Sequence, residues 1–286
     1  MPSLYIALLA VLPLTTLAHP TPEAEPELVK RAQQCGQYQT QTLGSYTLAT
    51  NGWGWSYGTG SQCAETLSLT GNTIAWDTTW TWSGGNTNVK SYTNVQRGFT
   101  QKQLSAYTSM PTAWNWTYTG TNLRANAAYD TFVGSSANGA NLFEVMVWLG
   151  LYGGTSVSPL SANGYPFTPI ATPTIGGTAF DLAYGLNGNV KVYSFVAHSR
   201  AATTYSGDFL AFYKYLATNY ASNGFSLSLY LQNFQAGTEV FTGSSAKLTT
   251  TGIKKEEIRE HLAELKQSAT TLHSILQVHM YTPAPR

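Results

Sequence analysis

The sequence predicts an all-β domain, a β-sandwich or jelly roll, and three observations support this. Between residues 36 and 250, short runs of alternating or aromatic residues are separated by Gly, Asn, Ser and Pro, as in chains of many short strands joined by turns. Charged residues make up only 10% of the 286 residues, whereas aromatic residues reach 13%. Apolar residues reach 43%, which is too many for a disordered chain. Because no repeat or linker divides 32–251, we treat that range as one domain.

Each expected strand is a segment of alternating or aromatic residues bounded by turn residues. These segments are 45–49, 64–69, 73–82, 89–92, 113–118, 124–132, 141–149, 179–184, 190–197 and 225–236. One segment differs, because residues 206–219 place Phe209, Phe212 and Leu216 at helical spacing after an acidic residue. The sequence therefore predicts a single short helix within the β domain.

The first 31 residues resemble processing segments. Residues 1–18 contain an apolar run too short to span a bilayer, followed by small residues, which predicts a signal peptide. Residues 19–31 are rich in Pro and Glu and end in Lys30-Arg31, which predicts a propeptide and a mature, secreted chain that begins at Ala32. A secreted route favours a disulfide between the only cysteines, Cys35 and Cys63.

Residues 252–286 have a different composition from the β domain. Apolar residues recur there at multiples of three and four among Lys and Glu, which predicts an amphipathic helix over roughly 254–279. Such a tail fits a helix packed on the domain, an oligomerisation segment or an altered gene end. A glycosylation sequon, Asn115-Trp116-Thr117, is expected to mark a surface loop.

Charge and composition exclude several classes of function. The net charge of +1 argues against a nucleic-acid binder, which needs a basic face. Residues 32–251 contain one histidine, His198, and the chain has two cysteines, so no metal site is expected. The sequence has no phosphate-binding loop, and we expect neither a cofactor nor a membrane partner. The many aromatic, amide and hydroxyl side chains suit binding to sugars by a monomeric protein.

Two predicted strands carry a glutamate in an unusual setting. In 141–149 the odd positions from Phe143 to Leu149 are apolar, whereas Glu144, Met146 and Trp148 share the other face. A carboxylate there is costly unless it is paired or lines a wet cleft, and the adjacent Trp suggests a sugar platform. In 234–241, Glu239 shares a face with Phe241, and Gly237 leaves the surface beside it open.

Two glutamates on such strand positions are what a retaining glycosidase needs. One acts as nucleophile and the other as acid and then base, with carboxyl groups about 5–5.5 Å apart. At that distance the charge of one raises the pKa of the other. The alternative is that Glu144 and Glu239 are unrelated surface residues.

Several segments, taken in order, resemble glycoside hydrolase family 12, a group of fungal and bacterial endoglucanases. They are Asn51-Gly52-Trp53-Gly54 with Gly60-Ser61-Gln62-Cys63, Trp80-Thr81-Trp82-Ser83-Gly84-Gly85 with Val89-Lys90-Ser91-Tyr92, Arg124-Ala125-Asn126-Ala127-Ala128-Tyr129-Asp130, Glu144-Val145-Met146-Val147-Trp148-Leu149, Val192-Tyr193-Ser194-Phe195-Val196-Ala197 with Tyr205-Ser206-Gly207-Asp208, and Gly237-Thr238-Glu239-Val240-Phe241-Thr242-Gly243. The resemblance covers about 35–250.

The resemblance implies a jelly roll of two stacked antiparallel sheets, with an open cleft on the concave sheet. It implies Glu144 as nucleophile, Glu239 as acid/base, and Asp130 as a supporting carboxylate beside the nucleophile. Cys35 and Cys63 fall where the family has its disulfide.

The resemblance also implies residues that bind substrate. Trp53 is expected to be a platform in a glycone subsite with Asn51 close by, although a core position is the alternative for Trp53. The other expected contacts are Asn126, Met146, Trp148 and Phe241. The last three are equally compatible with packing within the sheet.

Three departures from the family pattern stand out. Val240 replaces the usual proline after the acid/base, and 152–174 is longer than the common loop. The family usually continues into one more strand after a segment like 247–251, and here the charged tail takes its place. A sheet that lost a strand would expose an edge, so we expect the tail to be dispensable or harmful to folding.

The expected function is that of a secreted, retaining endo-β-1,4-glucanase that acts on cellulose or mixed-linkage glucan without a cofactor. A xyloglucan-specific endoglucanase is the nearest alternative, and a xylanase fits the motifs less well. A non-catalytic glucan-binding protein or elicitor is the alternative from another class, because it would share the aromatic surface without needing both glutamates.

Overall fold

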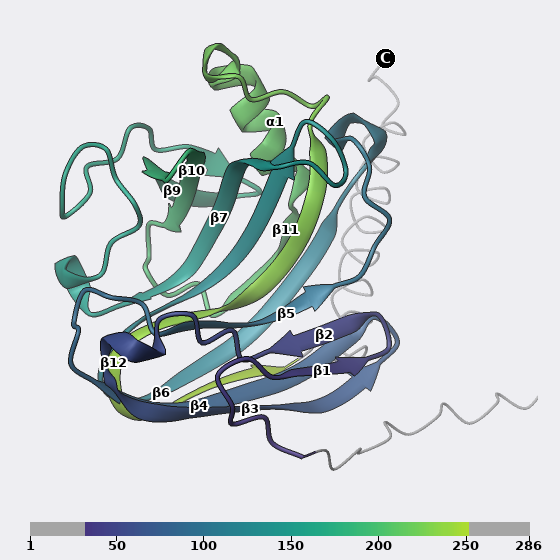
Figure 1. Cartoon of the computed structure of the whole chain (residues 1–286). Helices are drawn as coiled ribbons and strands as arrows, with labels where there is room; N and C mark the ends of the chain where they lie inside the picture. The colour runs from purple at the N-terminus through teal and green to yellow at the C-terminus, as the bar shows by residue number, and fades with distance from the viewer. Residues whose placement is uncertain (1–31, 252–286) are drawn as a thin grey trace, which may run out of the picture.

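The computed structural model describes residues 32–251 (Figure 1). The predicted signal peptide 1–18, propeptide 19–31 and helical tail 252–286 lie outside the described residues. The strands are β1 (Thr40–Leu43), β2 (Tyr46–Ala49), β3 (Thr59–Thr70), β4 (Thr73–Ser83), β5 (Ser91–Arg97), β6 (Pro111–Gly134), β7 (Asn141–Tyr152), β8 (Thr174–Ile175), β9 (Thr178–Asn187), β10 (Val190–Ala197), β11 (Thr204–Asp208) and β12 (Tyr230–Thr251). The described range has one α-helix, α1 (Leu210–Asn219), and four 3-10 turns, η1 (Trp55–Tyr57), η2 (Leu104–Ala106), η3 (Gly154–Ser156) and η4 (Ala221–Asn223).

Two long strands connect both layers of the fold. β6 has 24 residues and β12 has 22, and they pair with each other along most of their length. One layer has the order β1-β2-β5-β12-β6-β7-β10-β9-β8. In the other, β4 pairs with β3 and with the end of β12, while β11 pairs with the start of β6. The predicted sandwich of two sheets is confirmed, although one pair, β7 with β10, is parallel.

The expected strands 113–118 and 124–132 form a single strand, β6. Instead of a turn, the chain passes through Gly120 at φ +133° and Asn122 at φ +53°. A Cβ atom on Gly120 would lie 2.8 Å from the Cα of Ala246 in β12, so glycine allows the two long strands to approach closely here. The bend carries β6 from one layer to the other.

Two predicted boundaries were wrong because tertiary pairing overrides local pattern. The helix starts at Leu210 rather than at 206, because Thr204–Asp208 pairs with β6 as β11. The Asp208 carboxylate accepts hydrogen bonds from the backbone N–H groups of Leu210 and Met110 at 3.1 and 2.6 Å. β12 begins at Tyr230 rather than at 225, because the Phe225 ring packs in the core against Phe143 and Tyr213.

The main core is rich in aromatic side chains and lies on one face of the β7–β10–β9 region. Phe212 of α1 packs against Phe180 of β9 and Phe195 of β10, with ring centroids 5.2 and 5.0 Å apart. α1 therefore covers this face, as Figure 1 shows. The opposite face of β7 remains available for a site.

The last strand and the sequon differ from expectation. Residues 247–251 are the end of β12, and Thr250 pairs with Trp76 of β4 on one side and Trp116 of β6 on the other. The sequon Asn115-Trp116-Thr117 lies within β6, between β11 and β12, and not in a loop. Within 32–251, no helix is long and apolar enough to cross a membrane.

Candidate active site

The alternation predicted for 141–149 is present in β7. The side chains of Phe143, Val145, Val147 and Leu149 belong to the main core. Met146 and Trp148 belong to a second cluster on the opposite face, which Glu144 shares by strand alternation. This face therefore carries both the carboxylate and its aromatic neighbour.

Glu144 is only 7% exposed. Asn187, at the end of β9, donates a hydrogen bond of 3.5 Å from Nδ2 to its Oε2 atom. Burial raises the pKa of Glu144 above its ordinary value, and the hydrogen bond from Asn187 partly offsets this by favouring the charged form. A carboxylate held in this way is available as a nucleophile.

Glu239 of β12 is held by a single side chain, that of Asn126 in β6. The Nδ2 atom of Asn126 donates to Oε2 of Glu239 at 2.6 Å, and its Oδ1 atom accepts from the Glu239 backbone N–H at 2.7 Å. Burial raises the pKa of Glu239 to about 7, the negative charge of Glu144 adds to the rise, and the Asn126 hydrogen bond opposes it. Near neutral pH, Glu239 therefore keeps its proton in part, as an acid catalyst requires.

Asp130 of β6 lies between the two glutamates. Its strand partners are Met146 of β7 and Gln235 of β12, and it is 7% exposed. Burial raises the pKa of Asp130 well above the usual range, and the charges of Glu144 and Glu239 add to this effect, against a hydrogen bond from the Thr131 backbone. Its Oδ1 atom is buried with no hydrogen-bond partner among the described residues. This environment disfavours the charged form of Asp130.

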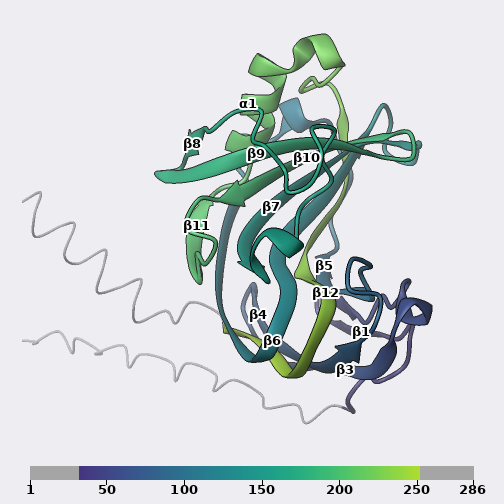
Figure 2. The same cartoon turned by 90° about the vertical axis from the view of Figure 1, so that its left-hand side faces the viewer.

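The curl of the sheet brings the acids together. Glu144 pairs with Phe132 of β6, whereas Glu239 is bonded to Asn126, six residues earlier on that strand. Six residues of flat strand span about 20 Å, yet the pKa of Glu239 responds to the charge of Glu144. Figures 1 and 2 show that β6, β7 and β12 bend strongly, so that the two ends of the bend face each other.

Two residues around Glu239 have roles that the sequence did not reveal. Lys90 is fully buried, and its Nζ atom donates to the carbonyl oxygens of Gly85, Asn88 and Phe241 at 2.8, 2.8 and 2.9 Å. Burial lowers the pKa of Lys90, and the Arg124 charge adds to this. A Cβ atom on Gly237 would lie 2.3 Å from the carbonyl oxygen of Thr93, so this glycine allows β5 to approach β12 rather than keeping a surface open. For Lys90, the signal that the sequence offered was a lysine that follows a run of Gly and Asn residues.

The expected glycone residues lie beside β5. Asn51 has φ +42°, and its carbonyl oxygen accepts a hydrogen bond from the backbone N–H of Tyr92 at 3.1 Å. Tyr92 in turn pairs with Glu239. Trp53 is 48% exposed, so the core alternative for this residue was wrong. Its side chain is therefore open to solvent.

Met146, Trp148 and Phe241 form a buried cluster beneath this surface. Trp148 is only 2% exposed, and its indole N–H donates to the sulfur atom of Met146 at 3.4 Å. The three side chains pack with Val157 and Val196. In the structure these three side chains pack within the sheet, as the alternative for them stated. They influence a ligand through the side chains that they support.

Cys35 and Cys63 form a disulfide across 28 positions of sequence. The bond ties the first described residues to β3, and the backbone of Gln34 pairs with that of Ala64 beside it. It lies in the layer opposite the three acids, so its role is to hold the fold.

Comparison with known proteins identifies the family. Residues 44–254 match the profile of glycosyl hydrolase family 12. The chain is 47% identical over 241 residues to the xyloglucan-specific endo-β-1,4-glucanase A of Aspergillus aculeatus, which covers 84% of this chain and 95% of that protein. It is 45% identical over 223 residues to the enzyme of the same name from Emericella nidulans, at 78% and 90% coverage.

Solved structures agree with this. Trichoderma harzianum endoglucanase 3 superposes with a TM-score of 0.70 at 38% identity, over 81% of this chain and 99% of that one. The Humicola grisea Cel12A catalytic domain, in complex with a thio cellotetraose, gives a TM-score of 0.69 at 33% identity, over 77% and 96%. The chain belongs to glycosyl hydrolase family 12.

Proposed function

We propose that this glycoside hydrolase is a secreted endo-β-1,4-glucanase that cleaves with retention of configuration. The observation that carries the proposal is the pair Glu144 and Glu239, in which the charge of Glu144 helps to raise the pKa of Glu239 to about 7. A retaining glycosidase needs this division, with one carboxylate ionised as nucleophile and the other protonated as acid.

The proposed reaction has two steps. Glu239 donates its proton to the glycosidic oxygen while Glu144 attacks C1, which forms a glycosyl-enzyme and releases the leaving chain. Glu239, now ionised, takes a proton from water, and that water attacks C1 and frees Glu144. Asn126 favours this cycle because its Nδ2 atom can donate to the ionised form of Glu239. The environment of Asp130 disfavours its charged form, which limits the negative charge beside the nucleophile.

A xyloglucan-specific activity is the second candidate. The curated relatives at 45% and 47% identity carry that name, and they cover most of this chain. The substrate is in either case a β-1,4-glucan backbone, and the choice is whether xylose branches are required. The disulfide Cys35–Cys63 supports secretion, since disulfides persist in oxidising compartments.

Release of reducing ends from mixed-linkage β-glucan and from xyloglucan tests the proposal. The purified 32–286 chain should be compared with Glu144→Gln, Glu239→Gln and the control Glu65→Gln on β3. We expect both site variants to lose hydrolysis while keeping the wild-type circular dichroism, and the control to match wild type. Near-normal turnover in either site variant contradicts the proposal. Binding without hydrolysis in a folded wild-type chain would instead support a glucan-binding protein.

The pH profile and the product anomer test the roles. The basic limb of kcat/KM should fall near pH 7, where Glu239 loses its proton. Proton NMR of fresh product should show the β-anomer first. An α-anomer would show inversion and remove Glu144 as nucleophile.

A further inference from the structure

The segment between β7 and β8 lies along strand β9. The backbone N–H of Ala162 donates to the carbonyl oxygen of Tyr184 at 2.8 Å, and that of Ile170 donates to Leu182, also at 2.8 Å. Between these two attachments residues 163–169 leave the strand, and we call them the 163–169 loop. Figure 1 shows the whole segment reaching beyond β9 and β10.

This segment covers the face of the sheet that carries Glu144. Glu144, Val192 and Gly185 are paired in register on the neighbouring strands β7, β10 and β9. A Cβ atom on Gly185 would lie 2.6 Å from the carbonyl carbon of Leu160, so the main chain of the segment rests on that glycine. Since neighbouring strands are about 4.8 Å apart, Leu160 lies roughly 10 Å from the strand of the nucleophile.

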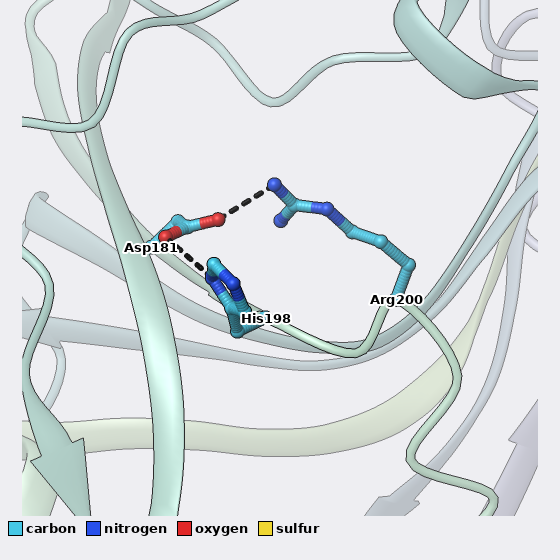
Figure 3. A network of polar contacts seen from close by, with 3 residues as sticks. All are labelled: Asp181, His198 and Arg200. Carbon is cyan, nitrogen blue, oxygen red and sulfur yellow. Dashed lines mark hydrogen bonds and ion pairs between the residues drawn. The ribbon is translucent and has the colours of Figure 1, made fainter.

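An ion-paired arginine anchors the loop at Phe167. The Arg200 guanidinium carbon lies 5.7 Å from the centroid of the Phe167 ring. Arg200 Nη2 is 2.6 Å from Oδ2 of Asp181, and His198 Nδ1 is 3.2 Å from Oδ1 of the same carboxylate (Figure 3). Asp181 is buried on β9 and pairs with Val196 of the cluster beneath the site. Arg200, which contacts the Phe167 ring, is therefore itself held in place by the buried Asp181 carboxylate.

Phe167 also packs against the cluster that contains Met146 and Trp148. These residues share the face of β7 with Glu144. The base of the 163–169 loop is thus in contact with the support of the catalytic strand. Tyr165, two residues before Phe167, is 64% exposed, so an anchored loop presents an aromatic ring to solvent at this edge of the site.

Tyr165 and Trp53 lie on opposite sides of the acids. The loop of Trp53 is bonded to β5 through Asn51 and Tyr92, whereas the 163–169 loop is attached to β9. In the strand order, β12, β6 and β7, which carry the three acids, lie between β5 and β9. A glucan chain that crosses the strands past Glu144 and Glu239 meets Trp53 at one end and the 163–169 loop at the other.

We propose that Tyr165 is a sugar-stacking residue for the leaving-group side of a β-1,4-glucan chain, and that Phe167 and Arg200 are positioning residues for it. This inference rests on the proposed function and on Trp53 lying at the glycone side. The flat face of an aromatic ring suits a pyranose ring, and a ring on an anchored loop loses little conformational freedom on binding.

Two substrates distinguish stacking by Tyr165 on the leaving-group side from a general loss of activity. Barley β-glucan places sugars on both sides of the cleaved bond, whereas 4-nitrophenyl β-cellotrioside, cleaved at its aryl bond, has none on the leaving side. We expect Tyr165→Ala to lower kcat/KM on the polymer about tenfold, mainly through KM, because stacking lost equally from ground and transition states raises KM. Activity on the aryl glycoside should stay at the wild-type value. Leu186→Ala, an exposed residue on the other face of β9, is the control.

The positioning role of Arg200 has its own test. We expect Arg200→Met to reproduce the polymer-specific loss, and Arg200→Lys to restore part of it, because an ammonium can still pair with Asp181. Equal losses on both substrates, or wild-type kinetics of Tyr165→Ala on both, overturn the inference while the proposed function stands. A wild-type chain inactive on both substrates overturns the proposed function, and this inference with it.

Discussion

Replacing Glu239 by Gln should stabilise the protein at high pH while it removes activity. The change keeps the shape of the side chain and lets the new amide oxygen accept the hydrogen bond from Asn126. What it removes is a partly buried negative charge that interacts with the charge of Glu144. An active-site charge of this kind costs stability in the folded state.

The size of the effect follows from the pKa. Moving a carboxyl pKa from 4.5 to about 7 corresponds to about 3 kcal/mol, at about 1.36 kcal/mol for each pKa unit. Because the folded protein binds this proton more tightly than the unfolded chain, the contribution is fully present below about pH 4.5. It is lost as pH rises through about 7. The wild type should therefore lose more stability over that window than Glu239→Gln, which keeps only the contributions of Asp130 and Glu144.

Denaturation by urea at pH 4 and pH 9, with the disulfide intact, measures this difference. We expect the free energies of unfolding of the two proteins to agree at pH 4 and to differ by about 3 kcal/mol in favour of the variant at pH 9. In thermal melts that corresponds to roughly 6–12 °C. Glu65→Gln on β3 serves as control. A variant no more stable than wild type at pH 9 would show that the ionised Glu239 carboxylate does not destabilise the folded protein.

Three further outcomes are expected. Lys90→Met should lower the free energy of unfolding by about 2–4 kcal/mol in urea titrations, because three backbone carbonyls lose their donor; unchanged stability would show that water replaces the amine. Replacing Cys35 and Cys63 by Ser should cost about 3–4 kcal/mol for a loop closed across 28 positions, without loss of the specific activity of the folded fraction; an inactive but folded variant would contradict a purely structural role. Trp53→Ala should raise KM on β-glucan about tenfold with kcat nearly kept, because stacking on an exposed indole binds the ground and transition states alike; a fall in kcat alone would place Trp53 in the chemical step instead.

The fold class and the candidate acids follow from the amino-acid sequence alone. Strand alternation placed Glu144 with Met146 and Trp148 on one face, because side chains alternate across any strand whatever its neighbours. Short motifs around Glu239 and Asp130 led to the family. Helix and strand ends were less predictable: residues 206–208 carry a helical pattern, yet they pair with β6. Local spacing cannot report a partner that is about 90 residues away.

The way in which the acids act together depends on the folded chain and could not be read from the sequence. Glu144 and Asn126 lie far apart along the flat register of β6 and β7, and it is the curl of the two strands that brings Glu239 within reach of the charge of Glu144. The raised pKa values follow from burial, which depends on packing and not on residue type. Burial likewise turned Trp148 from a candidate sugar platform into a support, and it left Trp53 exposed.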